Sequence, residues 1–398
     1  MPMSKFLSRH FSLADFEISA RKLLPKPLYA YVQGGVEDNL TLDANRQVFD
    51  DYFLKPNVLV DVSTRDISVD LFGHRYSAPV GIAPMGIAAL TGYRGDLSLA
   101  EAAAAANVPF VMSGSSLIRL EEVVNAAPNT WFQAYLPGDT AQIAPLIERV
   151  RKAGVKTLVI TVDTPVKANR ENNVRAGFST PLRPSVALAY QGVTHPRWLF
   201  GTFLRTLVKH GMPYFENNYA TRGAPAFSAS VVRDFTDRGH LNWEHVRQIR
   251  HQWPGAMVIK GVMQAADAAR CQQIGIDGIV VSNHGGRQID GSVPPLYVLP
   301  EIVEASGTMV VMADSGIRRG TDVIKSIAFG AKATFIGRPF NYANAVAGKA
   351  GVAHAIDLIV AEVRRDMGML GLIGLSDINQ DLLVRRQVLA RWRERDIN

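Results

Sequence analysis

Eight short apolar runs, most of them followed by a stretch of helical character, constrain the fold of this chain more than any other feature. Apolar runs without alternating polar residues are typical of strands buried on both faces, as in parallel sheets. Eight strand–helix units are the number that closes a (β/α)8 barrel. We therefore expect an α/β fold, a (β/α)8 TIM barrel, with strands at Val80–Ala83, Pro109–Met112, Trp131–Tyr135, Thr157–Val162, Met257–Val262, Gly278–Val281, Met309–Ala313 and Ala333–Ile336.

A doubly wound open sheet is the main alternative, because it also alternates strands and helices. A dinucleotide-binding fold of that kind carries a GxGxxG run after its first strand. No such run follows Val80–Ala83. The barrel is therefore the favoured prediction, with helices that include Leu97–Ala106, Ile143–Ala153, Ala265–Ile274 and Gly320–Ala328.

Three segments lie outside the strand–helix pattern. Ser12 fits the N-cap of a helix that runs through Leu24, which gives the barrel an N-terminal helical lead-in. More than ninety residues separate Val162 from Met257, so a long insertion, about residues 172–235, follows the fourth strand. The pattern over Asp377–Arg395 predicts a basic C-terminal helix.

The chain carries a net charge of +7, and its basic residues gather in the insertion and the C-terminal tail. Residues 172–215 contain no Asp or Glu. A helical wheel separates an apolar face from a polar one that consists of Thr202, Arg205, Thr206 and Lys209. Such a helix indicates peripheral contact with a membrane surface through this segment. Packing on the barrel or on a neighbouring subunit is the alternative. Nucleic acid is not expected, because no stacking motifs interleave the charge. The apolar face consists of Leu199, Phe200, Phe203, Leu204, Leu207 and Val208.

The cysteine content and the hydropathy limit where the protein is expected. A single cysteine, Cys271, excludes an intrachain disulfide and indicates a reducing compartment. No apolar run is long enough to span a bilayer, and the N-terminus lacks a signal-peptide core. We expect the protein on the cytoplasmic side of the inner membrane, held peripherally, or in the cytoplasm, and we expect no metal site.

The run Ser282-Asn283-His284-Gly285-Gly286-Arg287-Gln288 follows the sixth predicted strand. A titratable base and a fixed cation at one strand end suit the removal of a proton from a substrate that carries a carboxylate. In a β/α barrel the carboxyl ends of the strands form the active site. The other strand ends are unusually polar and carry Gln133, Tyr135, Thr161, Asp163, Lys260, Asp314 and Arg338.

The last two strand ends also predict a phosphate site. Residues 314–320 open the helix after the seventh strand with two glycines and two arginines, and Gly337-Arg338 follows the eighth. Glycines expose backbone N–H groups, a helix N-terminus adds positive potential, and arginines supply paired donors. Barrels commonly bind phosphate at these two loops.

Taken together, these motifs resemble the FMN-dependent L-2-hydroxy-acid dehydrogenase and oxidase family. The resemblance rests on SNHGGRQ (282–288), VIKGV (258–262), DSGIRRGTD (314–322) and FIGRP (335–339), and it extends to LPKPLYAYVQGGVED (24–38), IAPMG (82–86), WFQAY (131–135) and ITVDTP (160–165). It implies a single FMN-dependent catalytic domain over residues 1–398 and, by analogy with relatives, a homotetramer.

The resemblance also implies catalytic roles. His284 would take a proton from the substrate, and Asp163 would hold its imidazole ring. Lys260 would stabilise the anionic reduced flavin at its N1–O2 edge. The substrate's carboxylate and reacting oxygen would be bound by Arg287, Arg170, Tyr31 and Tyr135.

The same resemblance implies the residues that bind FMN. Asp314 would bind the ribityl chain. The phosphate would be bound by Arg318, Gly337 and Arg338. The isoalloxazine ring would be contacted by Met85, Gly86, Ser113, Gln133, Thr161, Lys260 and Ser282.

Two small residues bear on the substrate. Gly86 stands where glycolate oxidases carry alanine, and Ser115 stands where they carry tryptophan. Both features resemble the mandelate-type dehydrogenases. We therefore expect oxidation of (S)-mandelate or a related aryl 2-hydroxy acid to the 2-oxo acid, with electrons passed to a quinone or another membrane carrier. The alternatives are an L-lactate dehydrogenase, an oxidase that uses oxygen, a non-catalytic flavin-binding module and a flavin-free barrel acting on a phosphorylated substrate.

Overall fold

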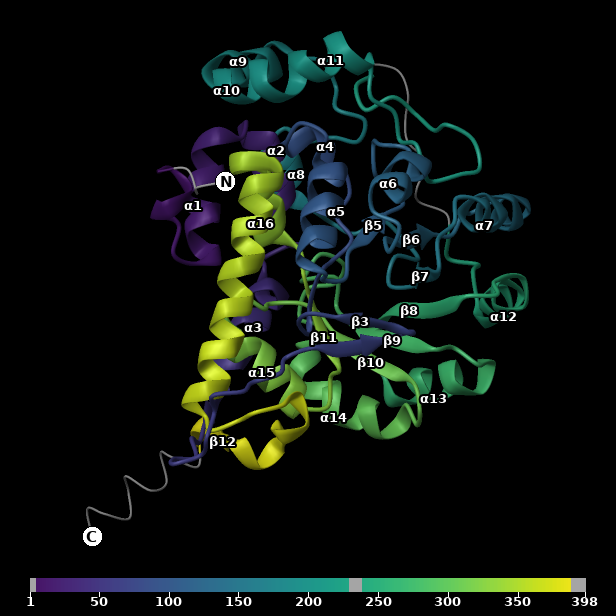
Figure 1. Ribbon diagram of the computed structural model, residues 1–398. Coiled ribbons are helices and arrows are strands. Elements are labelled where there is room, and N and C mark those ends of the chain that lie inside the picture. The colour runs from purple at the N-terminus through teal and green to yellow at the C-terminus, as the bar shows by residue number, and fades with distance from the viewer. Residues whose placement is uncertain (1–4, 229–237, 388–398) are drawn as a thin grey trace.

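The computed structural model, which describes residues 5–228 and 238–387, confirms the predicted (β/α)8 barrel (Figure 1). Eight parallel strands form one sheet in the order β4-β11-β10-β9-β8-β7-β6-β5. The backbone N–H of Ile82 donates to the carbonyl of Pro109 at 2.8 Å and closes the sheet between its first and second strands. The strands are β4 (Val80–Ile82), β5 (Val111–Ser113), β6 (Trp131–Tyr135), β7 (Thr157–Thr161), β8 (Ala256–Val262), β9 (Gly278–Val281), β10 (Val310–Ala313) and β11 (Ala333–Ile336).

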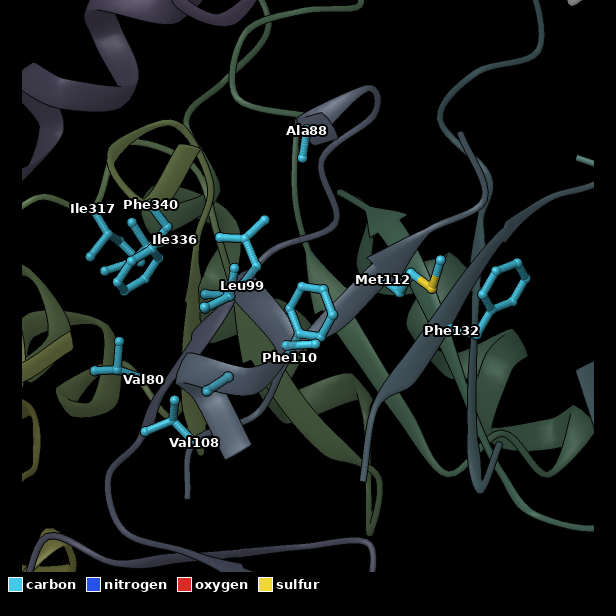
Figure 2. Packing of buried hydrophobic residues seen from close by; sticks show 14 of the residues in the cluster. Val80, Ala88, Leu99, Val108, Phe110, Met112, Phe132, Ile317, Ile336 and Phe340 are labelled. Atoms are coloured by element: carbon cyan, nitrogen blue, oxygen red, sulfur yellow. The ribbon is translucent and has the colours of Figure 1, made fainter. Parts of the chain in front are cut away.

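Helices surround the barrel and bury their apolar faces against the strands. Figure 2 shows part of this layer, around Leu99, Phe110 and Met112, all of which are buried. Each leucine buried in this way contributes about 1.5–3 kcal/mol. The outer helices are α5 (Gly95–Ala106), α6 (Leu120–Ala126), α7 (Ile143–Lys152), α12 (Trp243–Gln252), α13 (Ala265–Ile274), α14 (Pro295–Ala305), α15 (Gly320–Ala328) and α16 (Arg338–Met369), the last interrupted at Ala347 and Gly348.

A small hairpin covers the amino-terminal end of the barrel. Its strands β2 (Val69–Leu71) and β3 (His74–Tyr76) pair antiparallel. The indole N–H of Trp131 donates to the Tyr76 hydroxyl at 3.0 Å, and Phe72 meets the Trp131 ring edge-on. Because this end is covered by buried aromatic side chains, the functional groups lie at the opposite end, where the strands terminate.

The helical lead-in predicted before the first strand is also confirmed. Helix α1 begins directly after Ser12, whose backbone N–H donates to the Asp15 carboxylate at 2.9 Å, and it packs along α16. The lead-in consists of η1 (Leu7–Arg9), α1 (Leu13–Leu23), α2 (Lys26–Gln33), α3 (Leu40–Gln47) and η2 (Val48–Asp51).

The insertion after β7 forms helices at one end of the molecule, beyond α2 and α4 (Ala88–Thr91) (Figure 1). The predicted helix over residues 199–209 is present, but its predicted faces are partly wrong. Thr202, predicted on the polar face, is buried. The π-helical turn η4 (Leu199–Leu204) has wider i→i+5 spacing, so a 3.6-residue wheel misplaces this side chain. Phe200 and Val208, on the predicted apolar face, are 64% and 85% exposed. The other helices are α8 (Glu171–Arg175), α9 (Val186–Thr194), α10 (Pro196–Trp198) and α11 (Arg205–His210).

The basic helix predicted over Asp377–Arg395 is wrong over Asp377–Arg385, and only Arg386 and Gln387, the last described residues, are helical. Strand β12 (Leu383–Arg385) pairs antiparallel with β1 (Tyr52–Leu54), and two 3-10 turns, η5 (Leu375–Asp377) and η6 (Gln380–Leu382), precede it. The side chain of Asn379 caps the second of these turns. Pairing of this segment with β1 therefore outweighs the helical pattern of its sequence. Residues 388–395 of that helix and 229–235 of the insertion lie outside the described ranges.

Candidate active site

A histidine–aspartate pair lies at the carboxyl ends of two strands. His284 follows β9, Asp163 follows β7, and Nδ1 of His284 lies 2.9 Å from Oδ1 of Asp163. Burial lowers the pKa of His284, and Lys260 and Arg170 add to the effect, while Asp163 opposes it. Burial alone would raise the pKa of Asp163, but His284 and Lys260 lower it overall. The pair therefore holds a neutral imidazole beside an ionised carboxylate.

Lys260 lies at the end of β8 and is buried beneath this pair. Its ammonium group donates to Ser282 Oγ at 2.8 Å and lies 3.1 Å from Asp314 Oδ2. Burial alone would lower the pKa of Lys260, but Asp314 and Asp163 raise it overall. The structure thus places a protonated amine in the interior of the site, where a developing negative charge would be stabilised.

Two arginines meet on the other side of His284. The guanidinium of Arg170 donates to the Arg287 carbonyl at 3.1 Å and to Gln288 Oε1 at 2.6 Å. Arg287 donates to the carbonyl of Gly34 at 2.7 Å. Burial, together with the charges of Arg170 and Arg338, lowers the pKa of Arg287 to about 9, so it stays cationic at neutral pH. A cluster of partly buried cations of this kind binds anions strongly.

Aromatic side chains line the same space. The Arg287 guanidinium lies 5.1 Å from the Tyr31 ring centroid, and Phe178 stacks on Tyr31 at 4.6 Å. Burial raises the pKa of the Tyr135 phenol, so it remains a hydrogen-bond donor. A side chain at Gly86 would approach the Tyr31 hydroxyl to 3.0 Å and Ser115 Cβ to 3.1 Å. A larger residue here would require Tyr31 and Ser115 to shift by a few tenths of an ångström, so glycine widens the space between the first loop and Tyr31.

The residues predicted to bind the flavin ring lie at or near the carboxyl ends of the barrel strands. Ser113, Gln133, Thr161 and Ser282 are all buried. Within the described part of the chain, Gln133 Nε2 and Thr161 Oγ1 have no hydrogen-bond partner. Buried polar atoms without a protein partner are costly and indicate a ligand.

The residues predicted to bind the flavin phosphate lie on the loops that follow β10 and β11. Arg318 and Arg338 are cationic and held by backbone carbonyls, Arg318 by Ile317 and Arg338 by Val32, Gln33 and Gly34. Neither forms an ion pair with a carboxylate of residues 5–228 or 238–387. Met85 approaches Gly337, so the first and eighth loops are in contact.

Three side chains in the site were given no role by the sequence patterns. Gln288 bridges Arg170 and the Asp163 carbonyl, Phe178 packs on Tyr31, and Arg238 lies 5.2 Å from the Tyr135 ring. Gln288 is the last residue of the SNHGGRQ run, so its place in the site could have been predicted from the sequence. Phe178 lies in the insertion and Arg238 lies just after it, and no motif marks either residue.

Comparison with known proteins now decides the family. The model of the FMN-dependent dehydrogenases matches residues 20–385. The chain belongs to this family. An L-lactate dehydrogenase of Ectopseudomonas mendocina is 38% identical over 380 residues, covering 94% of this chain and 98% of that protein. The (S)-mandelate dehydrogenase of Pseudomonas putida is 35% identical over 375 residues, covering 94% and 93%.

A solved structure supports the same assignment. The structure of (S)-mandelate dehydrogenase described as a monotopic membrane protein matches with a TM-score of 0.85 at 33% identity, covering 95% of this chain and 100% of that one. The present chain is therefore an FMN-dependent 2-hydroxy-acid oxidoreductase. Four features of the described residues fit FMN. They are the polar atoms of Gln133 and Thr161 that have no partner there, the buried ammonium of Lys260, and Arg318 and Arg338, which have no carboxylate partner there.

Proposed function

We propose that this enzyme oxidises (S)-mandelate or a related aryl L-2-hydroxy acid to the 2-oxo acid and passes the electrons to a membrane quinone or a comparable carrier. The observation that carries the proposal is the placement of the His284–Asp163 pair next to the Arg170–Arg287 cluster. One group can accept a proton while the other holds a carboxylate, as a 2-hydroxy acid requires. Residues 1–398 are proposed to form one catalytic domain.

Each step assigned to the chain uses a stated atom. Oxidation of the 2-hydroxy acid releases two electrons and two protons. Bound FMN would supply the acceptor for both electrons and for one proton, and the other proton goes to the chain. Asp163 occupies Nδ1 of His284, so Nε2 is the nitrogen that takes the substrate proton. Asp163 then stabilises the imidazolium ion. Arg287 and Arg170 hold the carboxylate, and the Tyr31 and Tyr135 hydroxyls hydrogen-bond to the carboxylate and the reacting oxygen.

The flavin would be held by the strand ends described above. Ser113, Gln133, Thr161 and Ser282, with the backbone of Met85 and Gly86, are proposed to contact its ring system. Lys260 is proposed to stabilise the negative charge of the reduced ring. Asp314 would bind the ribityl chain, and Arg318, Gly337 and Arg338 would bind the phosphate.

An aryl side chain is favoured by the residues around the substrate space. Ser115 and Gly86 are small, and the stacked pair of Tyr31 and Phe178 offers an aromatic surface. L-Lactate is the second candidate, since the L-lactate dehydrogenase relative is 38% identical.

An anaerobic absorbance titration tests the function directly. The purified protein is titrated with (S)-mandelate and separately with L-lactate. Bleaching of the flavin bands by mandelate at lower concentration than by lactate supports the aryl assignment. Reduction by lactate alone would replace it with the lactate assignment, and reduction by neither acid would refute both. Reoxidation of the reduced flavin by oxygen as fast as turnover, with hydrogen peroxide released in each cycle, would identify an oxidase. Slow reoxidation by oxygen with fast turnover on an artificial dye would identify a dehydrogenase.

The activity should depend on pH through His284. The base must be neutral, and burial lowers its pKa below the ordinary value of 6.5. We therefore expect the rate of flavin reduction to be highest at and above pH 7 and to be lost as the pH falls below 6.5. Stopped-flow reduction between pH 4.5 and 8 measures this profile. A midpoint above 6.5 would contradict the arrangement.

Membrane contact is proposed for the helices of the insertion. No helix in residues 5–228 and 238–387 has the length and hydropathy of a membrane span. Val186, Tyr190 and Val193 of α9 are exposed, as are Phe200 and Val208. Exposed apolar side chains among basic ones suit the boundary of an anionic bilayer. The cations nearby are Arg183, Arg197, Arg205 and Lys209.

This contact would place the enzyme on the cytoplasmic side of the inner membrane, next to its electron acceptor. The proposed assembly is a homotetramer, which sedimentation can measure. One face of the insertion packs on the barrel itself, because the Trp198 indole donates to the Leu90 carbonyl at 2.7 Å. The other face remains available for the bilayer.

Replacing exposed apolar residues of the insertion should release the protein from membranes. We expect Phe200→Asp combined with Val208→Asp to reduce binding to vesicles of anionic phospholipid at least tenfold, with flavin reduction unchanged. Met369→Asp, at the far end of α16, removes an equally exposed apolar side chain and should have no effect. Vesicle co-sedimentation measures both. Equal losses in the two variants would refute the assignment of the surface.

A further inference from the structure

We infer that Asn45 of the N-terminal lead-in is a positioning residue for the catalytic turn, acting through a reciprocal amide pair with Asn283. This inference rests on the proposed role of His284 and extends it to a residue more than two hundred positions away in the sequence.

The turn that presents His284 has an unfavourable backbone. His284, Gly285 and Gly286 have φ angles of 58°, 67° and 71°, three consecutive residues in the left-handed region. Two of them are glycine, but His284 carries a side chain that disfavours this region. A conformation of this kind persists only where surrounding contacts hold it.

The amide of Asn283 supplies such contacts. Its Oδ1 accepts from Asn45 Nδ2 at 2.8 Å and from the backbone N–H of Gly286 at 3.2 Å. Its Nδ2 donates to Asn45 Oδ1 at 2.7 Å and to the Val293 carbonyl at 3.2 Å. All four hydrogen-bonding positions of this amide are used. Asn45 is 1% exposed, so no water can replace it at low cost.

Helix α3, which carries Asn45, is itself fixed to the loop that follows β9. Asp290 of that loop accepts from the backbone N–H groups of Asp38, Leu40 and Thr41 at the start of α3. At its other end, the side chain of Arg46 donates to the Gly316 carbonyl at 2.8 Å. Helix α3 therefore braces the catalytic loop and the phosphate loop together.

The packing between the turn and α3 leaves no room for adjustment. A side chain at Gly286 would approach the Leu42 backbone nitrogen to 2.6 Å. Loss of the Asn45 amide would leave Asn283 with unpaired positions and release the turn. His284 would then move relative to Asp163, Lys260 and Arg170, the charged groups that face it.

The test compares Asn45→Ala with the wild-type holoenzyme in anaerobic stopped-flow. We expect the rate constant for flavin reduction to fall by about 10- to 100-fold, since small misplacements of reacting groups have effects of that size. We also expect the midpoint of its pH profile to rise toward 6.5, because the released imidazole becomes less buried. Asn45→Asp, which keeps the volume but cannot donate to Asn283, should lie between the two and serves if the alanine variant does not fold.

Asn217→Ala is the matched control, because Asn217 is equally buried and its amide bonds the backbone at Leu120 and Ile118. We expect it to lower the melting temperature without moving the pH profile. Hydrogen exchange over residues 282–293 should rise in Asn45→Ala and not in Asn217→Ala. A rate within twofold of wild type with an unmoved pH midpoint and unchanged exchange would overturn the inference. Failure of wild type itself to be reduced by any 2-hydroxy acid would instead refute the proposed function.

Discussion

Replacement of His284 by alanine should lower the rate constant for flavin reduction by about 10³-fold or more while FMN remains bound. A positioned general base contributes about 10²–10⁴-fold to the rate of a proton transfer. Within residues 5–228 and 238–387, no other neutral nitrogen base is placed beside Asp163. The His284 side chain contacts Asp163. Its backbone N–H donates to Ser282, which is proposed to contact the flavin, and alanine keeps that N–H. Single-turnover reduction measures the rate, and the visible spectrum reports the bound flavin.

Two comparisons make the result specific. His251→Ala removes an exposed histidine on α12 and should keep the full rate. The alanine variant at 284 should also lose the acid limb of the pH profile, because that limb reports the protonation of the imidazole. A residual rate above one tenth of wild type would show that another group removes the proton.

The barrel was predictable because its strands are buried on both faces. Runs such as Gly278–Val281 and Ala333–Ile336 are apolar throughout, and the structure places them at the predicted bounds. Asp163, Lys260 and His284 lie at or near the ends of such apolar runs, so the sequence also predicts that they lie at strand ends. Geometry common to all β/α barrels then brings these residues to one end.

What the sequence could not provide depends on contacts between distant segments. Asn45 and Asn283 lie 238 positions apart, and neither carries a pattern that indicates their pairing. Phe178 reaches Tyr31 only because the insertion folds over the lead-in. The helical wheel over residues 199–209 failed at Thr202 because a π-helical turn changes the spacing.

Arg287→Met should reduce kcat/KM for the 2-hydroxy acid by about 10²- to 10³-fold, the range found when one partner of a buried, hydrogen-bonded charge pair is removed. The loss should appear in both KM and kcat. The carboxylate is bound in the ground state, and its orientation sets the approach of the substrate to His284. Arg287→Lys keeps the charge but not the planar fork of donors, so we expect an intermediate loss.

The stability of the same variant separates a binding role from a structural one. Burial and the repulsion from Arg170 and Arg338 already lower the pKa of Arg287 to about 9, so the site without substrate holds this cation at a cost. Removing it relieves that repulsion and offsets the lost hydrogen bond to Gly34. We therefore expect the melting temperature of Arg287→Met to stay near that of wild type while substrate no longer raises it. Normal saturation by substrate, or a large fall in the melting temperature, would show that Arg287 supports the fold and does not bind the carboxylate.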